Sequence, residues 1–387
     1  MIVTDDKAGR VRMTSDTACR HTKGGTRTVE DLGGFLDRGI RELGKDALRM
    51  VARRPALILG MKRLADGLAA AEAKRNRAKG SGLDVPPFMI ASITKICNLG
   101  CAGCYDAANS ASRCTEDLPA VTWGRVFAEA AGLGVAFMLL AGGEPLERQD
   151  VLDEAARRSG IVFPVFTNGL LIDGKAASFF ARNRNMIPIV SLEGGRQATD
   201  ARRGPGVFDK VMEAMELLSR EGVFFGTSLT MTRANIEEAA SQGFIGMLRS
   251  KGVGAFIYVE YVPVDGKGED LAFGKEERKT LASALDGLRE GVGGIHISFP
   301  GDEEAMGGCL AAGRGFVHIN HSGGLEPCPF SPVSDVSLKD MSLKEALGSP
   351  FLKRLRESGL MGMEHLGGCS LWNGRERVRE LLRRQEE

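Results

Sequence analysis

The stretch FMIASITKICNLGCAGC, residues 88–104, decides the fold. It joins a short apolar run, Phe88–Ile93, to a loop with Cys97, Cys101 and Cys104 at the spacing C-x3-C-x2-C. Three thiolates this close can surround one small cofactor, and thiolates are soft ligands that suit iron–sulfur clusters or zinc. A four-iron cluster held by three cysteines leaves one iron without a protein ligand, where chemistry can occur. The alternative is a zinc ion completed by a distant Cys or His.

From this first strand to about residue 300, short apolar runs alternate with amphipathic, helix-like stretches. Six strand–helix units in series predict parallel strands with right-handed crossovers. Six units are too few for a full eight-stranded barrel. We therefore expect an α/β fold, a partial (β/α)6 TIM-like barrel with functional loops at the carboxyl ends of its strands. The expected strands are Phe88–Ile93, Val135–Leu140, Ile161–Phe166, Ile187–Leu192, Phe224–Thr230 and Ala255–Val262, and the helix-like stretches include Val121–Ala131, Asp150–Arg158, Phe208–Arg220 and Ile236–Arg249.

The segments on both sides of the barrel have other patterns. Residues 28–79 carry apolar side chains at helical spacing, with a second helix expected to begin at Pro55. After the barrel we expect a hairpin, Phe316–Asn320 with Leu325–Cys328, and a helix over Ser342–Ser358. We divide the chain into 1–85, an N-terminal tail and helical extension; 86–300, the barrel; 301–375, a small second domain; and 376–387, a charged tail.

The composition limits the classes of function. The chain has 387 residues, 43% of them hydrophobic, which is typical of a globular protein. Lys and Arg number 51 against 50 Asp and Glu, so the charge gives no argument for a nucleic-acid partner. No apolar stretch approaches the roughly 20 residues of a membrane span, and the N-terminus lacks a signal-peptide pattern. We expect a cytoplasmic protein, in which eight cysteines point to metal binding or catalysis rather than disulfides.

A second motif follows the second expected strand, namely Gly142-Gly143-Glu144-Pro145. The glycines let a ligand approach the backbone, and Glu144 can receive an ammonium group. Placed one strand after the three-cysteine loop, this turn resembles the signature of the radical S-adenosylmethionine (radical SAM) superfamily. The resemblance covers roughly residues 88–300.

This resemblance implies an enzyme, of radical SAM oxidoreductase or transferase type. S-adenosylmethionine would chelate the unique iron of a 4Fe–4S cluster through its amino and carboxylate groups. One electron, ultimately from an external donor such as flavodoxin or ferredoxin, would cleave the sulfonium bond, and the 5′-deoxyadenosyl radical would abstract hydrogen from a substrate. The protein would bind, orient and exclude water. Two alternatives are a non-catalytic iron–sulfur electron-transfer or redox-sensing protein, which has no need of the glycine–glutamate turn, and a zinc-stabilised module.

The resemblance also assigns cofactor contacts residue by residue, and ordinary strand-end turn chemistry is the alternative for each. Glu144 would contact the methionine amino group. Ser191 and Glu193 match residues that hold the ribose and the carboxylate. Family members usually carry an aromatic residue or His before the third cysteine, against the adenine, whereas this chain has Gly103 there and Tyr105 just after. The cofactor-binding residues are thus predicted to be Gly142, Gly143, Glu144, Asn168, Ser191, Glu193, Ser228 and Tyr105.

Three more cysteines, Cys309, Cys328 and Cys369, lie in the last segment. The spacing C-x13-G-x4-C up to Cys328 resembles the first half of a SPASM auxiliary-cluster domain. The dense cysteine run of the second half is missing, so the segment resembles a reduced, twitch-like version. It implies one auxiliary 4Fe–4S cluster, and two clusters per chain, with unlinked buried cysteines as the alternative. The fourth ligand stays open between substrate, Cys114, His318, His321 and another group.

The substrate is the least determined feature. Glu260 and Tyr261 end the sixth expected strand and would face the barrel mouth, where they could position substrate or move a proton, unless they simply point to solvent. Many relatives with auxiliary clusters modify peptides, but residues 28–79 lack the strand pattern of a leader-binding domain. The substrate is therefore either a peptide or protein side chain or a small or apolar metabolite, including a lipid. The basic helical pattern of residues 28–79 fits either packing on the barrel or peripheral membrane contact.

Overall fold

The computed structural model describes most of the chain from residue 56 on, with side chains from residue 66. The helical pattern expected before residue 56, and Cys19 and Cys114, lie outside the described residues. The described residues are 56–108, 116–264, 266–301, 303, 308–362 and 369–384.

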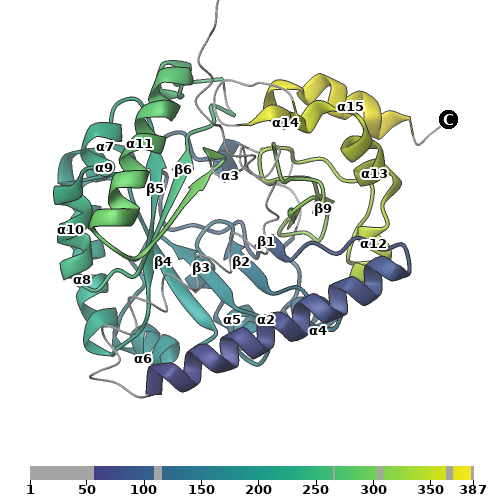
Figure 1. Ribbon diagram of the computed structural model, residues 1–387, viewed down its shortest axis with the longest axis horizontal. Coiled ribbons are helices and arrows are strands. Elements are labelled where there is room, and N and C mark those ends of the chain that lie inside the picture. Colours follow the sequence, from purple (N-terminus) through teal and green to yellow (C-terminus); the bar gives the residue numbers. More distant parts are fainter. Residues whose placement is uncertain are drawn as a thin grey trace, which may run out of the picture.

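A curled nine-stranded sheet forms the centre of the molecule (Figure 1). Its order is β7-β6-β5-β4-β3-β2-β1-β8-β9, and every neighbouring pair is parallel except β8 and β9. This arrangement confirms the predicted partial barrel. The strands are β1 (Phe88–Ser92), β2 (Phe137–Ala141), β3 (Phe163–Thr167), β4 (Met186–Leu192), β5 (Gly226–Met231), β6 (Ala255–Glu260), β7 (Ile295–Phe299), β8 (Phe316–Ile319) and β9 (Leu325–Glu326).

The sheet extends beyond the six expected strands at both edges. β7 pairs with β6, and its outward positions hold His296 and Ser298, both buried. His296 stacks on Phe256 with ring centroids 4.9 Å apart and bonds Tyr258 at 3.1 Å. Because two polar residues take the core positions of this strand, it has no continuous apolar run to reveal it.

The expected hairpin exists as β8 and β9, but it does not stand apart from the barrel. β8 pairs in parallel with β1, with Phe88 opposite Phe316 and Ala91 opposite Ile319. The small second unit expected over 301–375 therefore shares the barrel's sheet. Strand pairing across 220 or more residues leaves no local trace in the sequence, which is why the hairpin looked independent.

Helices cover the outer face of the curled sheet (Figure 1). The predicted helix over Ile236–Arg249 is two helices, because the Ser241 side chain caps the second one. The helix over Ser342–Ser358 is likewise divided, where Ser349 caps a helix that begins at Pro350. The helices are α2 (Ala56–Gly80), α3 (Tyr105–Ala108), α4 (Ala120–Leu133), α5 (Gln149–Ala156), α6 (Gly174–Arg182), α7 (Arg196–Arg203), α8 (Val207–Arg220), α9 (Ile236–Ala239), α10 (Gln242–Ser250), α11 (Lys275–Gly291), α12 (Leu343–Leu347), α13 (Pro350–Glu357), α14 (Ser370–Asn373) and α15 (Arg375–Arg383), with 3-10 turns η2 (Pro145–Glu147), η3 (Glu269–Leu271) and η5 (Leu360–Gly362).

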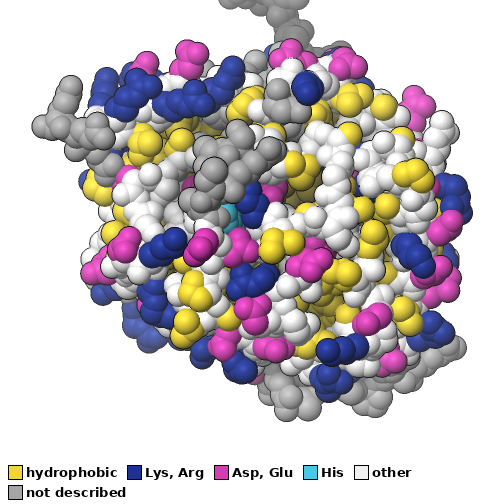
Figure 2. Space-filling model, turned by 180° about the vertical axis from the view of Figure 1, so that it is seen from behind, with side chains coloured by type: hydrophobic (Ala, Val, Ile, Leu, Met, Phe, Trp, Pro, Cys, Tyr) yellow, Lys and Arg dark blue, Asp and Glu magenta, His cyan; other side chains and the backbone are white. Residues whose placement is uncertain are grey.

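Helix α2 begins one residue after Pro55, as predicted, and crosses the lower edge of the molecule in Figure 1. Lys74 Nζ donates to the Ala131 carbonyl at 2.8 Å, and Arg75 donates to the Gly134 carbonyl at 2.7 Å. This part of the basic segment therefore packs on α4. Among the described helices, none combines the length and apolar character that crossing a membrane requires. On the face shown in Figure 2, acidic and basic side chains are interspersed.

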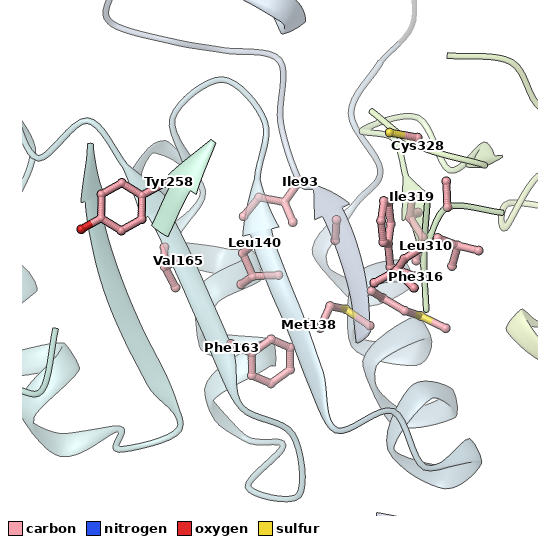
Figure 3. Packing of buried hydrophobic residues seen from close by; sticks show 14 of the residues in the cluster. Ile93, Met138, Leu140, Phe163, Val165, Tyr258, Leu310, Phe316, Ile319 and Cys328 are labelled. Carbon is pink, nitrogen blue, oxygen red and sulfur yellow. The ribbon is translucent and has the colours of Figure 1, made fainter. Parts of the chain in front are cut away.

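The two faces of the sheet have different surroundings. Along β2, Met138 and Leu140 point to the core under the helices and are fully buried, whereas Phe137 and Leu139 alternate with them and are only partly buried. Figure 3 shows Met138, Leu140 and Phe163 in this core, and Cys328 beyond the arrowhead end of β1. The strands thus present one packed apolar face and one open apolar face.

Candidate functional site

A cavity of about 1290 Å³ fills the inside of the curled sheet. Its wall consists of apolar side chains from the inward strand positions, such as Ile90, Leu139, Ile189, Ile257 and Ile297. Its volume exceeds the roughly 300–1,000 Å³ of an ordinary ligand pocket, which leaves room for more than one molecule. Both sets of predicted cysteines line it, namely Cys97, Cys101, Cys104, Cys309, Cys328 and Cys369.

The glycine turn supports the cysteine loop through its backbone. Gly143 N donates to the Thr94 carbonyl at 2.8 Å, and Glu144 N donates to the Ile96 carbonyl at 2.7 Å. A Cβ on Gly142 would lie 2.2 Å from the Thr94 oxygen, and one on Gly143 would lie 2.1 Å from the Ile96 oxygen. Both glycines also line the cavity. Glycine is therefore required at both positions because the turn lies so close to the backbone of the cysteine loop. From the sequence, we had attributed the two glycines to the close approach of a ligand.

Glu144 is buried, with 1% of its surface exposed. Its carboxylate accepts hydrogen bonds from Leu146 N at 3.0 Å, Thr167 Oγ1 at 2.8 Å and Asn168 N at 2.8 Å. Burial raises the pKa of this carboxyl, and these hydrogen bonds oppose the rise. The Glu144 side chain therefore connects the turn after β2 to the end of β3. It is not among the side chains that line the cavity.

Other predicted cofactor residues do line the cavity, among them Asn168, Ser191 and Ser228. Asn168 Nδ2 donates to Asn98 Oδ1 at 2.7 Å, within the cysteine loop, and lies 4.0 Å from Cys97 Sγ. Ser228 Oγ donates to Ser191 Oγ at 3.2 Å, across β5 and β4. The amide and the two hydroxyls thus form a polar band next to the thiols.

Glu193, by contrast, is 2% exposed and pairs with two arginines that sequence reasoning missed. Its Oε1 lies 2.6 Å from Arg202 Nη1 and 2.7 Å from Arg203 Nη2. Arg202 also donates to the Ala102 carbonyl at 3.1 Å, and Ala102 N donates back to the Arg202 carbonyl at 2.9 Å. Both arginines line the cavity, and they lower the pKa of the Cys101 thiol against the larger effect of burial.

These arginines have a sequence signal that was not used. They end a short, highly polar stretch and precede Gly204 in the pattern Arg-Arg-Gly. In the sequence, basic residues on such a polar helix are expected to face solvent. Only the hydrogen bond from Arg202, at the end of α7, to the cysteine loop shows that they face inward.

Two tyrosines border the cysteine loop. The Tyr105 ring meets the Phe330 ring edge to face, with centroids 5.4 Å apart, and so lies between the first cysteine set and the residues after Cys328. The Tyr261 hydroxyl donates to the Lys267 carbonyl at 3.1 Å. A Cβ on Gly103 would lie 2.6 Å from that Tyr261 oxygen. An aromatic ring therefore occupies the space beside Gly103, but it comes from the end of β6.

Glu260 faces the cavity, yet its charge is already paired. Its Oε2 accepts a hydrogen bond from Arg278 Nε at 3.0 Å, and the side chain is 1% exposed. Burial raises the pKa of Glu260, and Arg278 opposes the rise. The Glu260 side chain therefore does not point to solvent, and Arg278 on α11 compensates its charge.

The second cysteine set is deeply buried. Cys309, Cys328 and Cys369 are 8%, 6% and 5% exposed. A hydrogen bond between the thiols of Cys328 and Cys369 lowers the pKa of Cys369 and raises that of Cys328. Burial raises the pKa of Cys309 to about 12. Glu303, which sequence reasoning did not select, lines the same cavity; burial and the nearby Cys369 raise its pKa to about 8.

Neither candidate histidine lies with these cysteines. His318 is held between Ser92 Oγ at 2.8 Å and Glu326 at 2.7 Å, and His321 Nδ1 lies 3.0 Å from Asp117. Neither imidazole lines the cavity. Hydrogen bonds to other polar side chains therefore hold both imidazoles.

The donor set fits iron–sulfur ligation. Among the described side chains, no group of three or more His, Cys, Asp or Glu is arranged to hold a single metal ion. Three thiols from one loop open onto the cavity beside Arg202 and Arg203, and three further thiols open onto it from the last segment. Thiolates are the soft donors that iron–sulfur clusters use, so the chemistry of both sets fits a cluster.

Comparisons with known proteins agree with this geometry. Residues 91–241 match the radical SAM superfamily. The chain is similar to the mycofactocin maturase MftC of Mycolicibacterium smegmatis, with 29% identity over 268 residues that cover 65% of this chain and 66% of that protein. It thus spans about two thirds of that relative's length. It is also similar to the AdoMet-dependent heme synthase of Methanosarcina barkeri, with 25% identity over 293 residues that cover 68% and 82%.

Among solved structures, the chain resembles Streptococcus suis SuiB bound to the precursor peptide SuiA. The TM-score is 0.61 at 17% identity, over 74% of this chain and 70% of that one. The likeness shows that the two chains share a fold.

Proposed function

We propose that this chain, which belongs to the radical SAM superfamily, is an enzyme that reductively cleaves S-adenosylmethionine at a 4Fe–4S cluster. Cys97, Cys101 and Cys104 would hold the cluster. When bound, the cluster and S-adenosylmethionine supply the one-electron chemistry that removes a hydrogen atom from a substrate C–H bond. The observation that carries the proposal is the meeting of three thiols, the glycine turn and an open apolar cavity at one end of the curled sheet.

The chain's own residues offer each part of S-adenosylmethionine a partner. Arg202 and Arg203 place cationic groups at the cavity wall beside Cys101, where they suit the ligand's carboxylate. Ser191 and Ser228 present hydroxyls that suit the ribose. The Tyr261 ring, beside Gly103, suits a flat base.

Glu144 and Glu193 serve this site as positioning residues. The three donors on Glu144 fix the turn and the start of the loop after β3, and the pairing of Glu193 with the two arginines aims them at the cavity. We propose that cofactor contacts come from the backbone around Glu144 and from the arginines beside Glu193. This assigns the glutamates a different role from the direct contacts expected from sequence.

Cys309, Cys328 and Cys369 would hold a second, auxiliary cluster. Both cysteine sets line the same cavity, which supports the proposal that the two clusters would border one substrate space. The Tyr105–Phe330 ring contact bridges the residues next to Cys104 and Cys328. The electrons would come from an external donor of the flavodoxin or ferredoxin type.

The substrate would place an apolar C–H group inside the sheet, because inward strand positions leave an exposed apolar wall there. We propose a peptide whose apolar side chain enters this space. The similarity to the PqqA peptide cyclase of Gluconobacter oxydans, 25% identical over 289 residues, supports a peptide. An apolar small molecule is the second candidate, which the similarity to a heme synthase favours.

The test is anaerobic turnover of the reconstituted chain. With dithionite and S-adenosylmethionine we expect 5′-deoxyadenosine, and a deuterated substrate should transfer deuterium into it. Peptides with deuterated apolar side chains and deuterated apolar metabolites form the two arms. Full cluster loading without any 5′-deoxyadenosine would contradict the proposed activity.

A further inference from the structure

Glu303 lies where the three buried cysteines of the last segment meet the cavity. Its side chain is 6% exposed, as buried as Cys328. Glu303 and all three cysteines line the cavity. A carboxylate removed from water is costly unless a cation or hydrogen-bond donors stabilise it. Hydrogen bonds from Cys309 and Leu310 and the nearby Arg314 stabilise the Glu303 carboxylate, and an iron of a bound cluster would add a further cation beside it.

The contacts of Glu303 hold it against a would-be iron ligand. Its carboxylate is hydrogen-bonded to the Cys309 thiol and to the backbone N–H of Leu310. Its backbone is fixed on both sides, because Glu303 N donates to Pro300 O at 2.8 Å and Gly308 N donates to Glu303 O at 3.0 Å. The nearby Arg314 Nη1 donates to the Cys309 carbonyl at 2.7 Å. The carboxylate is thus positioned beside sulfur.

Among the residues that the structure describes, the two candidate histidines lie away from the three cysteines. His318 is held by Ser92 and Glu326, His321 is held by Asp117, and neither lines the cavity. Cys114 lies outside the described residues and stays an alternative ligand, which the experiment below tests. Among the described side chains that line the cavity next to the three cysteines, Glu303 offers an anionic donor.

We propose that Glu303 is the fourth protein ligand of the auxiliary cluster, which then has three thiolates and one carboxylate. The proposal rests on the proposed function only in that Cys309, Cys328 and Cys369 bind a cluster. It closes that cluster to external ligands, whereas the cluster at the first loop keeps an open iron. Carboxylate oxygen is a harder ligand than thiolate, so the iron on Glu303 is the one held least tightly.

The experiment isolates the auxiliary cluster in the full chain by replacing Cys97, Cys101 and Cys104 with Ala. In this background, the parent is compared with Glu303→Ala and Glu303→Cys after anaerobic reconstitution. Glu357→Gln is the control, because Glu357 is an exposed carboxylate at the end of α13. The measurements are iron content, Mössbauer spectra, the EPR signal after mild ferricyanide oxidation, and binding of ¹³C-cyanide followed by ENDOR.

In the parent and the Glu357→Gln control we expect a four-iron cluster that binds no cyanide. In Glu303→Ala the apparent affinity for the fourth iron should fall by roughly 10–100-fold or more, since even outer-sphere partners of metal sites are worth that much. The variant should therefore give the three-iron EPR signal on oxidation, and any four-iron form should bind cyanide. Glu303→Cys should restore the four-iron cluster with an altered Mössbauer spectrum.

Cyanide binding by the parent, or identical spectra for the parent and Glu303→Ala, would overturn the proposal. If Glu303→Ala takes up no cluster, Glu303→Cys decides: an altered four-iron spectrum supports the ligand, and an unchanged or absent cluster contradicts it. S-adenosylmethionine cleavage is measured separately with all cysteines present. Its absence would contradict the proposed function and leave the ligand assignment standing.

Discussion

The two cysteine sets share one cavity but differ in almost every local property. Cys97 is exposed and its two partners are partly buried, whereas Cys309, Cys328 and Cys369 are buried. The first set comes from a single loop of eight residues, and the second is collected from three distant segments. Exposed thiols beside cationic side chains suit a centre that must admit a ligand. Buried thiols beside a carboxylate suit a centre that is closed by the protein.

The largest expected effect is a difference in activity between variants of the two cysteine sets. We expect Cys101→Ala to abolish 5′-deoxyadenosine formation, because it removes a ligand of the open centre. Cys328→Ala should keep measurable cleavage of S-adenosylmethionine but lose substrate modification. In each variant, iron should fall from about eight toward about four per chain. Liquid chromatography of 5′-deoxyadenosine and product, with iron analysis, checks this. An equal loss of S-adenosylmethionine cleavage in both variants would contradict the proposal that the two cysteine sets have different functions.

The next effect concerns the support of the open centre. Gly143→Ala would place a Cβ 2.1 Å from the Ile96 oxygen, so the cysteine loop or the turn must shift. We expect cleavage to fall by about 100-fold, because small displacements at a reacting centre can cost that much. Gly132→Ala is the matched control, since nothing lies within 4 Å of its Cβ position. A wild-type rate for Gly143→Ala would show that the contact does not hold the loop.

Glu144 offers a test of stability as well as activity. Glu144→Ala leaves Thr167 Oγ1 and two buried N–H donors without their acceptor, which should lower the free energy of unfolding by roughly 2–4 kcal/mol. Glu147→Ala, in the same turn but exposed, should change it by less than about 0.5 kcal/mol. Urea denaturation of the anaerobic protein measures both. Similar values for the two variants would mean that the buried network contributes little.

The smallest effect should come from the arginine that joins α7 to the cysteine loop. Arg202→Ala removes a cation from the cavity wall and the hydrogen bond to Ala102. We expect the Kd for S-adenosylmethionine to rise by roughly tenfold, equivalent to about 1.4 kcal/mol. Arg196→Ala, which removes another arginine of α7 and breaks its exposed pair with Asp209 on α8, is the control. Isothermal titration under anaerobic conditions distinguishes them, and equal affinities would remove Arg202 from the ligand site.

Local patterns in the sequence were enough to predict the first cysteine set and the six central strands. The C-x3-C-x2-C loop and the Gly142–Pro145 turn are each contiguous in the sequence, so the chemistry proposed for them can be inferred without the fold. β7 was missed because His296 and Ser298 interrupt its apolar pattern. Glu303 and Arg202 were missed because each acquires its role from partners far along the chain. Long-range pairing, such as that of β1 with β8, is invisible in one sequence.

The central claim is that the centre at Cys97, Cys101 and Cys104 has an open iron and the centre at Cys309, Cys328 and Cys369 does not. EPR of the reduced, fully loaded chain with and without S-adenosylmethionine tests this most directly. The account predicts that one of two overlapping cluster signals shifts on adding the ligand, and that this signal is missing in Cys101→Ala. A spectrum that S-adenosylmethionine leaves unchanged, or a shifting signal that survives Cys101→Ala, would contradict it.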